Sequence, residues 1–173
     1  MKFRLFAASL LITAVPALAD PAVGQWVTVD DDDGSHKSVV NISVNDEGKL
    51  QGTVIEILQE EEKGKLCEEC PDDFKNQPIE GLTFMWGLEK EGEGEWESGH
   101  ILDPESGKIY KSKLEVGEDG ETLEVRGYIG VSWIGRSQTW LKYEEPAQTA
   151  EATDAAEEAS EAVSEQATTA TAE

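Results

Sequence analysis

The scarcity of alanine between residues 20 and 143 most constrains what this chain can fold into. The segment holds a single alanine, Ala22, together with all 16 glycines and all five tryptophans of the chain. Alanine is the best helix former, whereas β-branched and aromatic residues favour strands and glycine favours turns. Valine, isoleucine and threonine are frequent in the same segment. The composition therefore predicts an all-β domain.

Eight short stretches of this segment have the alternating apolar and polar residues of half-buried strands. They cover residues 24–29, 37–44, 50–58, 82–88, 96–102, 108–116, 121–130 and 136–143. Most are separated by turn sequences such as Asn45-Asp46-Glu47-Gly48, and a longer charged loop covers 59–80. Tight turns imply antiparallel neighbours, and a twisted sheet of this size closes readily because closure removes its exposed edges. We predict an antiparallel up-and-down barrel, with a two-sheet sandwich as the alternative.

Residues 1–19 have the pattern of a secretion signal. Two basic residues, Lys2 and Arg4, precede an apolar run, and the small residues Ala17 and Ala19 follow it. This arrangement predicts a signal peptide that is cleaved before Asp20. The apolar run is about half as long as the roughly 20 residues that span a bilayer. We therefore expect a periplasmic protein without a membrane span.

Acidic side chains dominate the rest of the chain. The formal net charge is −23, and residues 144–173 contribute nine acidic and no basic side chains. We predict that this Ala/Glu/Thr segment is a disordered tail, acting either as a solubilising segment or as a docking tail for a basic partner. The domain at 20–143 retains 28 acidic and 12 basic side chains. Such a charge disfavours nucleic acid and anionic membrane surfaces as partners.

The only two cysteines form the motif Cys67-Glu68-Glu69-Cys70. Such a motif can be a structural disulfide, a redox dithiol or half of a zinc site. Expected export favours the disulfide, the pattern of strands lacks the βαβ unit of a thioredoxin-like protein, and the adjacent glutamates oppose thiolate formation. His36 and His100 fit no zinc-finger spacing. We predict a Cys67–Cys70 disulfide, no metal site and no cofactor.

Catalytic motifs are absent from the sequence. Ser98, His100 and Asp103 resemble a hydrolase triad, but no Gly-x-Ser-x-Gly elbow accompanies them. The acidic run 30–33 does not fit a calcium loop, because Val29 and Val40 would occupy ligand positions. We therefore predict that the protein is not an enzyme.

An eight-stranded barrel is either filled by its side chains or holds one small ligand. Our leading hypothesis is a monomer or weak dimer that binds a small hydrophobic or amphipathic molecule. The candidate wall residues are Trp86, Trp96, Tyr110, Tyr128 and Trp133, with Arg126 as a polar anchor. The alternative for Arg126 is a surface arginine or one stacked on a tryptophan. The alternative function is a filled barrel that contacts envelope proteins through its acidic surface and tail.

A series of short motifs occurs in the order seen in a bacterial family. They are Gly24-x-Trp26, Cys67-x-x-Cys70, Gly99-x-Ile101-x-Asp103-Pro104, Gly107-Lys108-x-Tyr110, Val125-Arg126-Gly127-Tyr128 and Gly135-Arg136-x-Gln138-Thr139-Trp140. Over residues 23–142 the chain resembles the exported domain-of-unknown-function family 2147. The resemblance implies an exported lipocalin-like (calycin) barrel, a fold that suggests ligand binding, and the family has no established activity. The resemblance also implies structural roles for Gly24, Trp26 and Arg136, with the arginine stacked on the tryptophan at one end of the barrel.

Overall fold

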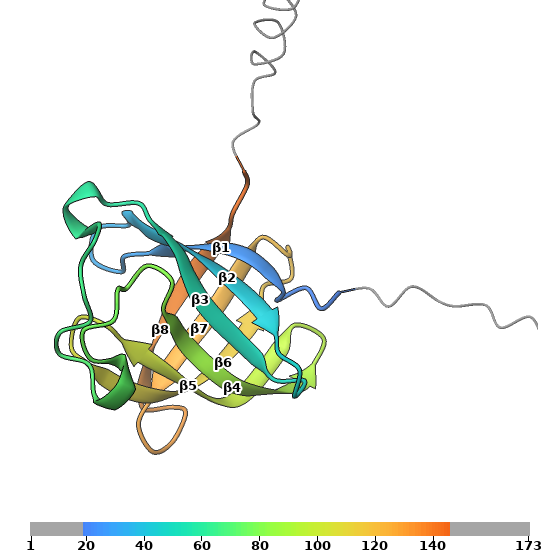
Figure 1. The fold of residues 1–173 in the computed structure, drawn as a ribbon. Helices are drawn as coiled ribbons and strands as arrows, with labels where there is room; N and C mark the ends of the chain where they lie inside the picture. The colour runs from blue at the N-terminus through green and yellow to red at the C-terminus, as the bar shows by residue number, and fades with distance from the viewer. Residues whose placement is uncertain (1–18, 146–173) are drawn as a thin grey trace, which may run out of the picture. The chain divides into compact units, whose positions relative to one another are not determined.

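The computed structural model describes residues 19–145, which form a closed antiparallel barrel (Figure 1). Its eight strands are β1 (Gly24–Val29), β2 (His36–Val44), β3 (Leu50–Ile57), β4 (Thr83–Gly92), β5 (Glu95–Asp103), β6 (Lys108–Val116), β7 (Thr122–Tyr128) and β8 (Gly135–Lys142). Each strand pairs with the next along the chain, and β8 pairs with β1. The prediction of an all-β up-and-down barrel is therefore confirmed, and the sandwich is excluded.

The long connection between β3 and β4 lies along one side of the barrel, green in Figure 1. It contains two single-turn 3₁₀ helices, η1 (Glu60–Glu62) and η2 (Asp72–Phe74). Within residues 19–145, no helix is long and apolar enough to cross a membrane. The predicted signal peptide, except for its last residue, and the predicted tail beyond residue 145 lie outside the described residues.

The observed strands follow the predicted ones closely, and β4 differs most. We expected it to end at Leu88, but it continues to Gly92. Lys90 pairs with Trp96 and Gly92 pairs with Glu95 across the β4–β5 hairpin. The charged residues after Leu88 remain in the sheet because their side chains face solvent while their backbone groups still bond to β5.

One end of the barrel is packed with large side chains. Trp26, Leu50, Leu88 and Leu123 are fully buried there. The indole Nε1 of Trp26 donates a hydrogen bond to the carbonyl oxygen of Ala22, at 3.0 Å. This contact brings the segment before β1 across the closed end of the barrel.

The cation over Trp26 is Lys142, whereas the family resemblance implied Arg136. The Nζ of Lys142 lies 5.3 Å from the centroid of the Trp26 ring. Strands β1 and β8 are antiparallel, and their register pairs Trp26 with Lys142. Arg136 lies six residues earlier in β8, at the opposite end of the barrel, where it contacts Asp31. The expected stacking of Arg136 on Trp26 is therefore corrected.

Asp20 links the segment before β1 to strands β4 and β5 at the closed end of the barrel. Its Oδ1 accepts hydrogen bonds from Trp96 Nε1 at 3.1 Å and from the backbone N–H of Ala22 at 3.0 Å, while its Oδ2 lies 2.9 Å from Lys90 Nζ. The side chain is only 6% exposed. Burial alone would raise the pKa of Asp20, but the hydrogen bonds from Lys90, Trp96 and the backbone more than offset it, so the pKa lies below its usual value.

Replacing Asp20 with asparagine is expected to lower the free energy of unfolding by about 2 kcal/mol near neutral pH, because charge-assisted hydrogen bonds are lost. A carboxyl group whose pKa is lowered by folding stabilises the protein above its unfolded pKa of about 3.9, and this contribution is lost as the pH falls through the folded value. The difference between the wild type and Asp20→Asn should therefore shrink below about pH 4 in urea titrations. A difference that does not change with pH would contradict this account, and Asp46→Asn in the exposed β2–β3 turn is the control.

Candidate functional site

The end of the barrel opposite Trp26 is hollow. A cavity of about 650 Å³ opens there between the β1–β2, β3–β4, β5–β6 and β7–β8 connections. All eight strands contribute residues to its lining. Small-molecule sites in proteins commonly have volumes of about 300–1,000 Å³. The cavity is therefore large enough to hold one small ligand.

The deep part of the cavity is apolar. Apolar residues of the lining form it, among them Val54, Ile57, Phe84, Leu102, Val125 and Trp140. Leu102 and Trp140 are each only 1% exposed, and the rings of Phe84 and Trp140 have centroids 6.0 Å apart. The apolar tail of a ligand bound here would be transferred from water to contacts with aliphatic and aromatic side chains.

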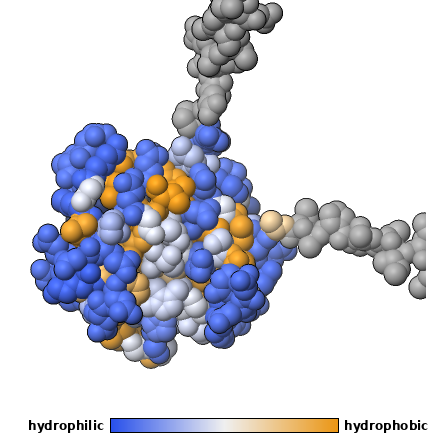
Figure 2. Space-filling view, viewed as in Figure 1, coloured by the Kyte–Doolittle hydropathy of each residue, from blue (hydrophilic) through white to orange (hydrophobic). Residues whose placement is uncertain are grey.

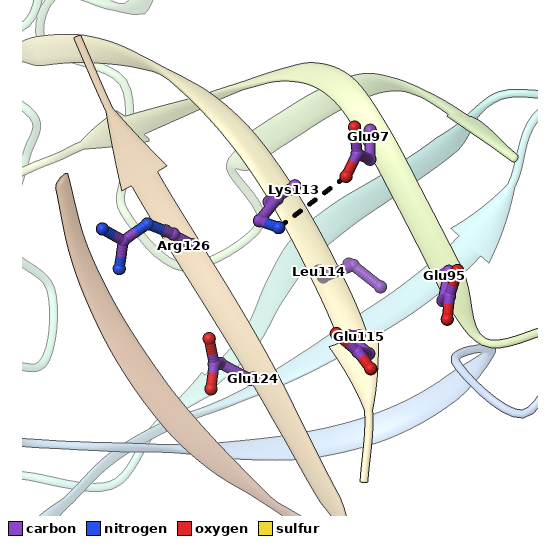
Figure 3. Close-up of a pocket in the computed structure, with 7 residues that line it drawn as sticks. All are labelled: Glu95, Glu97, Lys113, Leu114, Glu115, Glu124 and Arg126. Carbon is purple, nitrogen blue, oxygen red and sulfur yellow. Dashed lines mark ion pairs between the residues drawn. The ribbon is translucent and has the colours of Figure 1, made fainter. Parts of the chain in front are cut away.

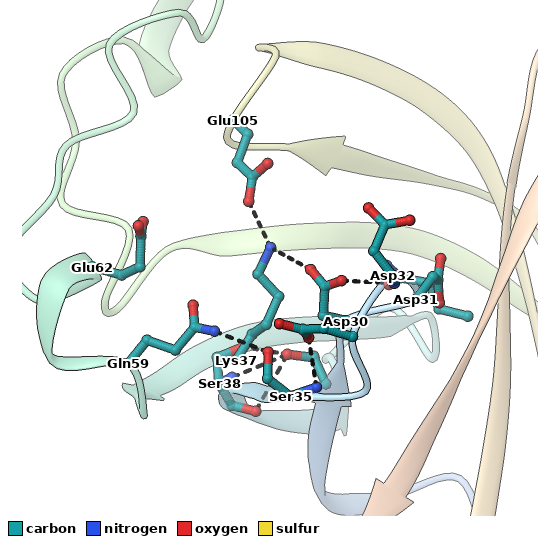
Figure 4. A network of polar contacts seen from close by, with 12 residues as sticks. Asp30, Asp31, Asp32, Ser35, Lys37, Ser38, Gln59, Glu62 and Glu105 are labelled. Atoms are coloured by element: carbon teal, nitrogen blue, oxygen red, sulfur yellow. Dashed lines mark hydrogen bonds and ion pairs between the residues drawn. The ribbon is translucent and has the colours of Figure 1, made fainter.

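A charged network crosses the mouth of the cavity. The Nζ of Lys37 in β2 lies 2.7 Å from Oε1 of Glu105 in the β5–β6 turn and 3.3 Å from Oδ2 of Asp30 (Figure 4). Strand β2 and the β5–β6 turn lie on opposite sides of the closed barrel, because three strands separate β2 from β6 on one side and three on the other. The Lys37–Glu105 ion pair therefore spans the opening.

Both partners of Lys37 keep it charged. Burial lowers the pKa of Lys37, but the hydrogen bonds and negative charges of Glu105 and Asp30 more than offset this effect and raise the pKa above its usual value. The backbone N–H of Asp32 and the ammonium group of Lys37 lower the pKa of Asp30. Both shifts favour the charged forms of Lys37 and Asp30.

A second ion pair holds the β1–β2 connection at the mouth. The Nε of Arg136, near the start of β8, lies 2.6 Å from Oδ2 of Asp31. Arg136 also lines the cavity. The two basic side chains at the mouth, Lys37 and Arg136, are therefore both paired with carboxylates.

The cysteine motif supports the mouth from the side. Cys67 and Cys70 lie at disulfide-bonding distance, as predicted, with their Cα atoms 5.3 Å apart. Both cysteines are buried, and their Sγ atoms lie 3.9 and 4.0 Å from the carbonyl oxygen of Pro104. The β3–β4 connection thus packs against the same β5–β6 turn that carries Glu105 to the mouth.

The structure brings two of the six predicted ligand-binding residues to the cavity. Tyr110 of β6 and Tyr128 of β7 belong to its lining. Three tryptophans do not: Trp86 stacks on Phe74 and His100, Trp96 is buried at the closed end beside Asp20, and Trp133 is 78% exposed in the β7–β8 connection.

Arg126, the predicted anchor, lies on the outer face of the barrel (Figure 3). It borders a groove of about 110 Å³ that also contains four glutamates and Lys113. Its guanidinium donates hydrogen bonds to the carbonyl oxygen of Ser132 and to Oγ of Ser137, at 2.5 and 2.8 Å. Arg126 therefore holds the β7–β8 connection in place from outside the cavity.

Sequence reasoning missed Lys37 and Trp140. The register of the β7–β8 hairpin would have located Trp140, since it pairs Leu123 with Trp140 and Val125 with Gln138. Paired residues lie on the same face of a sheet, so the apolar face of β7 identifies the inner face of β8. Nothing in the local sequence around Lys37 indicates its contact with Glu105, which is 68 residues away along the chain.

Within residues 19–145, no three His, Cys, Asp or Glu side chains are grouped closely enough to hold a metal ion. His100, which the sequence placed near Ser98 and Asp103, stacks on Trp86 instead.

Comparisons with known proteins agree with this barrel. The model of a family described as an uncharacterised protein conserved in bacteria, DUF2147, matches residues 24–142. No curated protein matches the chain. Among solved structures, the chain is similar to protein HP1028 from the human pathogen Helicobacter pylori, which belongs to the lipocalin family. The similarity has a TM-score of 0.63 at 21% identity and covers 72% of this chain and 84% of that one. It confirms the predicted lipocalin-like fold.

Proposed function

The chain belongs to the DUF2147 family of uncharacterised bacterial proteins, and we propose that it binds one small hydrophobic or amphipathic molecule without catalysing a reaction. The observation that carries this proposal is the cavity of about 650 Å³ at one end of the barrel. Its apolar floor suits an aliphatic or aromatic body, and its charged mouth suits a polar head group. Tyr110 and Tyr128, which line the cavity, are the proposed ligand contacts among the residues predicted from sequence.

The cavity also favours binding over the alternative of a filled barrel that acts through its surface. In a filled barrel, inward side chains would occupy both ends. Large residues such as Trp26 and Trp96 pack the closed end here, and the open end retains the volume of a ligand site. Hydrophilic residues cover most of the face in Figure 2, with hydrophobic residues in smaller patches between them.

We further propose that the protein works in the periplasm as an exported barrel domain of residues 20–143. The signal-like pattern of residues 1–19 supports this proposal, and the disulfide is compatible with an oxidising compartment. Cleavage before Asp20 would leave the residue that fastens the closed end as the first residue of the exported protein.

Titration with a neutral amphiphile, dodecan-1-ol, tests the proposed function. Moving one CH₂ group from water into an apolar site is favourable by about 0.8 kcal/mol, and a micromolar Kd corresponds to about 8 kcal/mol of binding free energy. A chain of twelve carbons can therefore reach a micromolar Kd. We expect saturable one-to-one binding by calorimetry and a change in tryptophan fluorescence, because Trp140 lines the cavity.

The variant Trp140→Phe locates the bound amphiphile. It should keep calorimetric binding within a few fold and lose most of the fluorescence change, since its other tryptophans do not line the cavity. Absence of saturable binding to the wild type would contradict the proposal. A fluorescence change that persists unaltered in Trp140→Phe would place the amphiphile elsewhere.

A further inference from the structure

We propose that the cavity selects ligands with a positively charged head group, of the class of aliphatic amines, over ligands with a carboxylate head. The inference rests on the proposed function, because contacts with the apolar floor hold the ligand and the charges at the mouth discriminate between head groups. Five carboxylates line the cavity, against two basic side chains, Lys37 and Arg136. The carboxylates are those of Asp30, Asp32, Glu62, Asp103 and Glu105.

The two basic side chains are already neutralised by neighbours. Lys37 contacts both Asp30 and Glu105, and Arg136 contacts Asp31. An anionic head group would therefore have to displace a carboxylate from one of them before it could form an ion pair. The displaced carboxylate would remain nearby and repel the head group.

The carboxylates are in excess at the mouth. The side chain of Asp32 forms no ion pair within residues 19–145, and neither does that of Asp103. The two oxygens of Asp103 accept hydrogen bonds from the backbone N–H of Glu105 and from Oγ of Ser106, which keep the carboxylate fixed at the mouth. An ammonium group has charge partners there without displacing any existing contact.

The shape of the site places the head group of the ligand among these carboxylates. An aliphatic tail on the apolar floor puts the polar end of the ligand at the only charged part of the cavity that the described residues provide. Low-dielectric walls focus the field of charges at the mouth of a cleft. The attraction for a cation and the repulsion of an anion therefore act at a defined position, unlike the diffuse effect of the net charge.

Three probes with the same twelve-carbon tail test the selection near pH 7: dodecylammonium, dodecan-1-ol and dodecanoate. The two ionic probes are kept below their micelle concentrations and dodecan-1-ol below its solubility limit. We expect dodecylammonium to bind at least about tenfold more tightly than dodecanoate at low salt, with dodecan-1-ol between them. The ratio should shrink as salt rises from about 20 mM to about 200 mM, because ions screen partly exposed charges.

A pair of double variants distinguishes the effect of the carboxylates that line the cavity from the effect of the protein's net charge. Asp32→Asn with Glu105→Gln removes two negative charges from the mouth, and it should reduce the preference for the cation by at least about threefold. Asp46→Asn with Glu47→Gln removes the same charge from the exposed β2–β3 turn at the closed end. This control should keep the preference of the wild type.

The outcomes distinguish the two proposals. If dodecan-1-ol binds while dodecanoate binds as tightly as dodecylammonium, the head-group selection is overturned and the proposed function stands. If both double variants lose the preference equally, the net charge of the protein causes it and the inference fails. If none of the three probes binds, the proposed function fails, and the selection fails with it.

Discussion

Gly107→Ala is expected to lower the free energy of unfolding by about 4 kcal/mol, in the range of the most damaging single substitutions. Gly107 has a φ of +67°, and a Cβ atom there would overlap the carbonyl oxygen of Glu69. The overlap is with backbone, so no side-chain rotation relieves it. The Cys67–Cys70 loop, whose two cysteines are buried, would have to move away from the β5–β6 turn.

Gly48→Ala is the matched control for this substitution. Gly48 has a φ of +75°, but a Cβ atom there would meet nothing within 4 Å. Gly48→Ala is therefore expected to lower the free energy of unfolding by about 1 kcal/mol, which is the cost of placing alanine in a left-handed backbone conformation. Urea denaturation of both variants measures the difference. Equal losses would show that the contact between the cysteine loop and the β5–β6 turn contributes nothing to stability.

Gly127→Leu is expected to abolish most ligand binding while leaving the fold intact. Gly127 lines the cavity, and a Cβ atom there would lie 3.5 Å from Cγ2 of Ile101 and 3.6 Å from Cβ of Tyr110, which are ordinary contacts. The leucine side chain would extend into space that the ligand needs. The affinity for dodecan-1-ol should fall at least about tenfold, with less than about 1.5 kcal/mol of lost stability.

The control for this second substitution is Thr139→Leu. Thr139 is exposed on β8, so an added leucine there enlarges the outer face of the barrel and leaves the cavity unchanged. Calorimetry should give the wild-type affinity for Thr139→Leu and a strongly reduced affinity for Gly127→Leu. Equal affinities in the two variants would mean that the ligand does not enter the cavity.

The fold was predictable because its signals are local. Alternation of apolar and polar residues marks the strands, and tight turns such as Asn45–Gly48 imply antiparallel order. Closure into a barrel follows from the twist of a sheet with this many strands. The extension of β4 to Gly92 was missed, because charged residues that hydrogen-bond in a strand do not differ in sequence from a charged turn.

The candidate site was less predictable because its geometry depends on contacts across the barrel. The alternation in β7 already placed Arg126 opposite Leu123 and Val125, and since those two residues face the core, Arg126 faces outward. The Lys37–Glu105 ion pair joins opposite walls and has no local sequence signal. The resemblance to a family correctly implied a lipocalin-like barrel, but it wrongly placed Arg136 over Trp26. Only the register between β1 and β8 shows that Lys142 lies there.

Native mass spectrometry with dodecan-1-ol tests the central claim most directly. We expect one adduct per wild-type chain, retained in Thr139→Leu and strongly reduced in Gly127→Leu, because the ligand occupies the cavity of about 650 Å³. A wild-type chain that carries no adduct at saturating amphiphile, or an adduct that Gly127→Leu retains in full, would contradict it.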